Sequence, residues 1–169
     1  MSKIMQIFDI YSKILSSLGT ICLIGIMMYI VLSVSVRYIT GIPFLGSYEL
    51  GSTFLPLIAA SYYMYADIKN RHIRATIFFD RFGRKTKIFL LFMFSLISSG
   101  IILMVSWRVA LFGVRAYQNL DETSVLGLRM DLFLFVYSFL LLSYAIYLFF
   151  KAIDSLKGAP EVVEYSEKF

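Results

Sequence analysis

The side chains best suited to chemistry stand in one short stretch, ADIKNRHIRATIFFDRF, at positions 66–82. It holds the only histidine of the chain, His72, with Asp67 and Asp80 on either side. A catalytic histidine needs a nucleophile or an acid within reach, and these carboxylates are the nearest candidates. A zinc site needs about four His, Cys or carboxylate ligands, but the chain offers no second histidine and only one cysteine, Cys22. We therefore expect no catalytic site, no metal site and no cofactor, and interpret His72 as a loop or headgroup-level residue.

The elements that flank this stretch are strongly apolar. Of the 169 residues, 59% are hydrophobic and 16% are charged, whereas soluble domains have about 45–50% apolar and about 25% charged residues. Each uncharged segment is close to the roughly 20 residues that cross a hydrocarbon core, and backbone groups in lipid must bond within a helix. We predict an all-α membrane protein, a single domain over 1–169 with four transmembrane helices. The predicted spans are 14–36, 50–66, 88–107 and 132–150.

Basic residues are distributed unevenly between the two sides of these spans. Twelve of the 16 Lys and Arg residues fall in the N-terminal tail, in the segment between the second and third spans, or in the C-terminal tail. The other four fall in the outer segments, roughly 37–49 and 108–131. Because positive residues favour the cytoplasmic side, we predict that both termini are cytoplasmic. The net charge of +5 is then a topology signal, and nucleic acid is not expected as a partner.

The basic segment between the second and third spans has a helical period. On a helix over 75–87, apolar residues that include three phenylalanines share one face, and basic residues gather on the other. Such a helix lies in the membrane interface, where each basic residue near anionic headgroups adds about 1 kcal/mol of attraction. The alternative is a solvated basic loop. The predicted cytoplasmic interfacial anchor comprises His72, Arg74, Phe78, Phe79, Arg81, Phe82, Arg84 and Lys85.

A second set of charges lies on the outer side: Arg37, Glu49, Arg115, Asp121 and Glu122. Arg37 and Glu49 flank a short loop, and a pair across it is one interpretation of their placement. Glu49 also opens a predicted helix, where the helix dipole favours a negative group. Two interpretations remain open for the set: ordinary solvated loop residues, which are common, or a surface that contacts an external partner.

The four predicted spans contain no Asp, Glu, Lys, Arg or His. A transporter that binds a charged solute within the bilayer usually places ionisable groups there, and a channel lines its pathway with polar or acidic groups. We therefore predict that the chain is not an enzyme and does not move a charged solute by itself. A self-contained oligomeric small membrane transporter or channel is the alternative.

The order of these features resembles a known family. A span that ends in VRY, a short loop with Pro43, a carboxylate in SYEL and the run FLPLIAASYYMYADIKNRHIRATIFFDRF are similar to the small membrane subunit of tripartite ATP-independent periplasmic (TRAP) transporters, the DctQ type. The resemblance is most specific from Arg37 to Phe82, and the last two spans match only as hydrophobic helices. Many members carry an aromatic residue followed by two acidic residues, whereas this chain has Glu49 alone at that place.

The resemblance implies a sodium-driven symport system in a bacterial inner (cytoplasmic) membrane. A periplasmic solute-binding protein would capture a carboxylate solute, of the sialic acid or dicarboxylate class. A large TRAP membrane subunit would move that solute by an elevator motion. The small subunit would be a non-catalytic, multi-pass scaffold for the large one and a docking surface for the binding protein, which would bind transiently. Membrane lipids would be its remaining partners.

Overall fold

The structure, a computed structural model, describes residues 3–41, 46–69 and 84–156. Four helices make up nearly all of this part: α1 (Lys3–Thr40), α2 (Ser47–Ile68), α4 (Arg84–Asn119) and α5 (Met130–Leu156). The described residues contain no strand, only an isolated antiparallel bridge between Glu122 and Arg129. The predicted all-α fold is confirmed.

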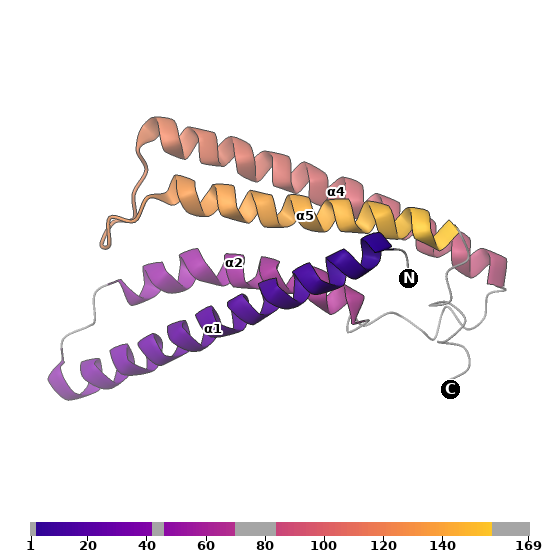
Figure 1. The fold of residues 1–169 in the computed structure, drawn as a ribbon. Helices are drawn as coiled ribbons and strands as arrows, with labels where there is room; N and C mark the ends of the chain where they lie inside the picture. The colour runs from indigo at the N-terminus through magenta and orange to yellow at the C-terminus, as the bar shows by residue number, and fades with distance from the viewer. Residues whose placement is uncertain (1–2, 42–45, 70–83, 157–169) are drawn as a thin grey trace.

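The helices form two antiparallel hairpins (Figure 1). α1 packs on α2, α4 packs on α5, and the hairpins meet mainly through α2 and α5. The loop that joins α4 to α5 lies at one end of the bundle, which we call the loop end. α1 begins and α5 ends at the opposite end, which we call the terminal end.

The main buried cluster lies toward the terminal end, where α1, α2 and α5 converge. It contains Met5 from α1, Met64 from α2, and Tyr144, Tyr147 and Leu148 from α5. Tyr147 is only 1% exposed, so a large aromatic side chain fills the centre of the junction. This cluster fixes how the first hairpin sits on the second.

Small residues let the paired helices approach closely. On α1, a Cβ added at Gly19 would collide with the Ser61 side chain of α2. Between α4 and α5, Ser106 and Ser138 each donate a hydrogen bond to the other's carbonyl oxygen, both at 2.9 Å. Small residues and interhelical hydrogen bonds of this kind hold helices together where water is absent. These two serines therefore satisfy their polar groups within the bundle.

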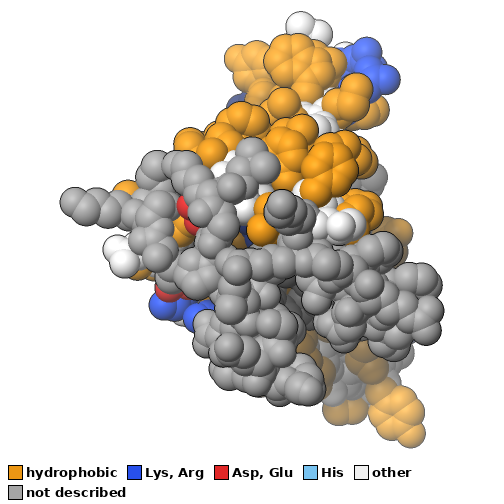
Figure 2. All heavy atoms as spheres, turned by 90° about the vertical axis from the view of Figure 1, so that its right-hand side faces the viewer, with side chains coloured by type: hydrophobic (Ala, Val, Ile, Leu, Met, Phe, Trp, Pro, Cys, Tyr) orange, Lys and Arg blue, Asp and Glu red, His pale blue; other side chains and the backbone are white. Residues whose placement is uncertain are grey.

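Three of the described helices are long and apolar enough to cross a membrane, at Met5–Thr40, Ile88–Asn119 and Met130–Ser155. Large apolar side chains stand exposed along them, as at Met104, which is 72% exposed. Figure 2, a view onto the terminal end, shows hydrophobic side chains at the surface, with acidic and basic side chains together at one edge. An apolar surface of this extent belongs in lipid or against another membrane protein.

Helix α2 is not among these three. It carries Glu49 and Asp67 near its ends, Pro56 inside and several tyrosines, which lower its hydropathy. Its 22 residues span about 33 Å at 1.5 Å per residue, which is long enough for a hydrocarbon core. Crossing of the membrane by α2 therefore stays a prediction.

Helix α4 is longer than the predicted third span. It continues through 108–119, which the sequence assigned to an outer segment, and it begins at Arg84, which the sequence placed in the interfacial helix. Long basic side chains can reach the headgroups while their helix continues. The charged residues at each end of the apolar run therefore do not end the helix. The remainder of the predicted interfacial helix, up to residue 83, lies outside the described residues.

Candidate functional site at the two ends of the bundle

Glu49 joins the two hairpins at the loop end. It lies in the first turn of α2, and its carboxylate accepts hydrogen bonds from the backbone N–H groups of Val125, at 2.8 Å, and Leu126, at 3.0 Å. Both donors belong to the loop between α4 and α5. Leu126 also packs on Gly46, where an added Cβ would lie 2.6 Å from Leu126 Cγ. Gly46 has a φ of 85°, so glycine suits this position both for its backbone and for its contact.

The electrostatics of Glu49 favour its charged form. Partial desolvation would raise the pKa of the carboxyl group, but hydrogen bonds from Leu126, Thr123 and Val125 outweigh it, and the pKa lies below its ordinary value of 4.5. The first turn of a helix also favours a negative charge. Glu49 is therefore an anion that orders the neighbouring loop.

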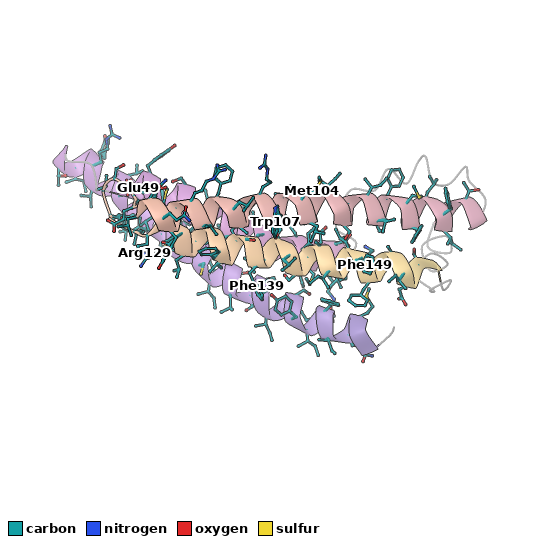
Figure 3. The ribbon with its side chains drawn as sticks, turned by 90° about the horizontal axis from the view of Figure 1, so that it is seen from above. Glu49, Met104, Trp107, Arg129, Phe139 and Phe149 are labelled. Carbon is teal, nitrogen blue, oxygen red and sulfur yellow. The ribbon has the colours of Figure 1, made fainter. Side chains whose placement is uncertain are left out.

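The same loop is held by its own hydrogen bonds. The Thr123 N–H donates to the Leu128 carbonyl oxygen at 3.0 Å, and the Leu128 N–H donates to Thr123 Oγ1 at 3.0 Å. Arg129 forms a two-pronged ion pair with Asp131, at 3.2 and 2.8 Å. The loop end, where Figure 3 labels Glu49 and Arg129, thus presents a surface of defined shape.

The other outer-face residues of the sequence prediction lie on three different elements. Arg37 is exposed in the last turn of α1, and the described residues hold no ion pair between it and Glu49. Glu49 bonds instead to amides 76 and 77 residues further along, because α2 packs against α5 while the end of α1 leans away (Figure 1). Arg115 is exposed on α4, and Asp121 and Glu122 are exposed in the loop.

The predicted interfacial anchor falls mostly outside the described residues. This applies to His72, Arg74, Phe78, Phe79, Arg81 and Phe82. Arg84 and Lys85 belong to the first turn of α4, and the structure does not describe their side chains. The anchor remains a prediction.

At the terminal end the structure reveals an ion pair that the sequence did not predict. Lys151 Nζ of α5 lies 2.6 Å from Asp67 Oδ2 of α2, and the side chains are only 15% and 11% exposed. The Lys151 ammonium also lies 5.7 Å from the centre of the Tyr147 ring. The sequence does contain a pattern that points to this ion pair, since Asp67 and Lys151 are the first charged residues after the second and fourth apolar runs. Opposite charges at corresponding ends of two spans are candidates for pairing.

A second, more exposed charge group lies beside this pair. Asp9 of α1 pairs with Lys13 at 2.6 Å, and Lys69 Nζ lies 4.0 Å from its other carboxylate oxygen. Lys13 is 51% exposed, so this pair is weak compared with a buried one. Together the two groups connect α1, α2 and α5 at the terminal end.

Between the two ends, the described helices carry no charged side chain in their predicted spans. The apolar runs of α1, α2, α4 and α5 lack Asp, Glu, Lys, Arg and His, and the described residues contain no cluster of three or more potential metal ligands. The arrangement can bind helices and loops to one another. Over these runs it offers no paired acid and base, and no charged group for a solute within the bilayer.

Comparison with known proteins gives a family match. Residues 26–158 match the family model described as the DctQ component of tripartite ATP-independent periplasmic transporters. The match includes Glu49, Asp67, Lys151 and all of α2, α4 and α5. No curated protein and no solved structure matches the chain.

Proposed function

The chain belongs to the DctQ family of TRAP transporter components, and on that premise we propose that it is the non-catalytic scaffold of its transporter. The family implies a large membrane subunit and a solute-binding protein as partners. In this proposal the large subunit carries the solute, a carboxylate of the sialic acid or dicarboxylate class, in symport with sodium. The present chain holds the fixed part of that subunit in the membrane.

The observation that carries the proposal is the placement of charge. Asp67 pairs with Lys151, and Glu49 accepts two amide hydrogen bonds, so these groups connect helices and none faces a pathway through the middle. A carrier for an anionic solute and a cation needs polar groups at the depth where it binds them. A scaffold needs a rigid bundle with an apolar surface for contact, which fits the exposed faces of α1 and α4.

The orientation is part of the proposal. The basic tails and the basic segment before α4 favour a cytoplasmic terminal end, which places the loop end in the periplasm. Asp121, Glu122, Arg115 and Arg37 would then be accessible to the binding protein. Glu49 has a supporting role, because it fixes the loop that bears the two acidic residues.

Reconstitution tests the scaffold function. The chain and the large membrane subunit of its transporter would be produced together and separately, with an affinity tag on this chain. We expect the large subunit to purify with the tagged chain at a fixed ratio, and solute uptake in vesicles to need both. Full uptake by vesicles that contain the large subunit and binding protein alone would refute the proposal.

A further inference from the structure

Two arginines on α4 form a feature that the scaffold function does not use. Arg108 and Arg115 are seven residues apart, which places them on one face of the helix, two turns from each other. Leu111 and Phe112 lie between them, and these four side chains line a hollow in the surface. All four belong to α4, so the hollow opens outward from the bundle.

The charges of this hollow are not neutralised by the described part of the chain. Arg108 and Arg115 are exposed, and neither forms an ion pair with a described residue. Among the loop-end carboxylates, Glu49 accepts from two amides and Asp131 pairs with Arg129. Asp121 and Glu122 are exposed in the loop, and neither forms an ion pair with Arg108 or Arg115 within the described residues. The Arg115 guanidinium lies 5.8 Å from the centre of the Phe112 ring, so its position is defined by an apolar neighbour.

The register of α4 on α5 sets the depth of Arg108. Ser106 and Ser138 exchange hydrogen bonds and are therefore level with each other. Because the helices are antiparallel, Arg108 is level with the residue two places before Ser138. Arg108 therefore lies about 7.5 Å along the helix axis from the level of Asp131, at 1.5 Å per residue. The polar end of α5 begins at Asp131. Arg115, seven residues further on, lies at the polar end itself.

The surface around the hollow is apolar and exposed. Met104 is 72% exposed and Trp107 is 68% exposed, and Met104 points away from α5 (Figure 3). A guanidinium beside such a surface is costly without an opposite charge, and it turns toward the headgroup region. The planar guanidinium matches the oxygens of a phosphate and binds them with two hydrogen bonds.

From these observations we propose that Arg108 and Arg115 bind the phosphate group of a membrane phospholipid. The phosphate lies between the two guanidinium groups, near the polar end of α5. The glycerol and the upper part of one acyl chain lie against Leu111 and Phe112. The site takes a diacyl phospholipid, and the phosphate supplies the counter-charge that the described chain does not provide.

Native mass spectrometry of the purified full-length chain tests the site. The chain in detergent is titrated with dioleoylphosphatidylglycerol, and bound lipid is counted for the native chain, for R115Q and for R108Q/R115Q. The control variant is R37Q, since Arg37 is also an exposed arginine toward the loop-end side of its helix but lies outside the hollow. Dioleoylglycerol, which has the same acyl chains without a phosphate, is the control lipid.

We expect the native chain and R37Q to bind one phosphatidylglycerol molecule at least tenfold more tightly than R108Q/R115Q. R115Q changes only the arginine nearer the polar end, and its affinity for phosphatidylglycerol should fall several-fold. This variant remains informative if R108Q/R115Q does not fold. Dioleoylglycerol should not occupy the site. Equal phosphatidylglycerol binding by R115Q and the native chain would overturn the proposal, as would equal binding of dioleoylglycerol. Unchanged phosphatidylglycerol binding by R108Q/R115Q would overturn the proposal as well.

Discussion

Lys151 of α5 and Asp67 of α2 form a 2.6 Å ion pair with both side chains largely buried, and it connects the two hairpins at the terminal end. Glu49 connects the same two hairpins at the loop end through the amides of Val125 and Leu126. α2 is thus joined to the second hairpin at both ends, by the ion pair with α5 and by hydrogen bonds from the loop before α5. This explains how a chain with mostly apolar helices keeps one arrangement of them.

Asp67→Asn should destabilise the bundle, because it removes the carboxylate charge that lies 2.6 Å from the largely buried Lys151 ammonium. Removal of one partner from a buried pair costs about 3–5 kcal/mol. The measurement is the free energy of unfolding in detergent. Lys13→Met is the matched control, since Lys13 and Asp9 are also 2.6 Å apart but Lys13 is 51% exposed; its cost should stay below about 1 kcal/mol.

The reversed pair, D67K/K151D, separates charge pairing from packing. If the ion pair carries the effect, the double variant should recover a large part of the stability lost in D67N. Equal destabilisation by D67N and K13M would contradict the special role of the buried pair.

Glu49→Gln should loosen the loop between α4 and α5 while the helices remain folded. Glutamine keeps the shape of the side chain but replaces one acceptor oxygen by an amide donor and removes the charge. Hydrogen exchange at the amides of Val125 and Leu126 should speed up several-fold. Exchange at the Thr123 and Leu128 amides, which bond within the loop, should change less, and an equal change at all four would argue against a direct role for Glu49.

Acid should release the loop in the same way. The pKa of Glu49 is lowered in the folded chain, so its contribution is complete above its ordinary value of 4.5 and is lost as the pH falls through the lower, folded pKa. The protection of the Val125 and Leu126 amides, corrected for the intrinsic exchange rate, should therefore fall below pH 4.5. The Glu49→Gln variant should lack this step, and a step of the same size in that variant would show that another group titrates.

Gly19→Ala should weaken the contact of α1 with α2, because the new Cβ collides with Ser61. Overpacking of this kind costs about 1–3 kcal/mol. Gly25→Ala is the matched control on the same helix, since no atom lies within 4 Å of its added Cβ, and alanine there should be neutral or slightly stabilising. Thermal unfolding of both variants measures the difference, and equal unfolding temperatures would contradict a close crossing of α1 and α2 at Gly19.

The sequence predicted the helices well and their connections poorly, for physical reasons. The apolar run 132–150 lies wholly inside α5, because lipid and backbone hydrogen bonding together leave no other structure for it. The continuation of α4 to Asn119 was missed because Arg108 interrupts the apolar run, and hydropathy reports where a helix meets lipid, not where it ends. The family itself was predicted from residues 37–82 and is confirmed by the match over 26–158.

The partners of the charged residues depend on contacts between distant parts of the chain. The sequence offered Arg37, across a short loop, as one partner for Glu49, whereas the donors to Glu49 lie 76 and 77 residues away. Asp67 and Lys151 are 84 residues apart. Such partners follow from the packing of α2 beside α5, and no periodicity within either segment reports that packing.

We propose that this chain supports a carrier and does not itself carry the solute. The most direct measurement is uptake, in sealed vesicles, of the solute that the partner binding protein retains on purification. Three preparations are compared: this chain alone, the large subunit alone, and both together, each with the binding protein and an inward sodium gradient. We predict uptake only with both subunits present. Sodium-dependent uptake by vesicles that contain this chain without the large subunit would contradict the account.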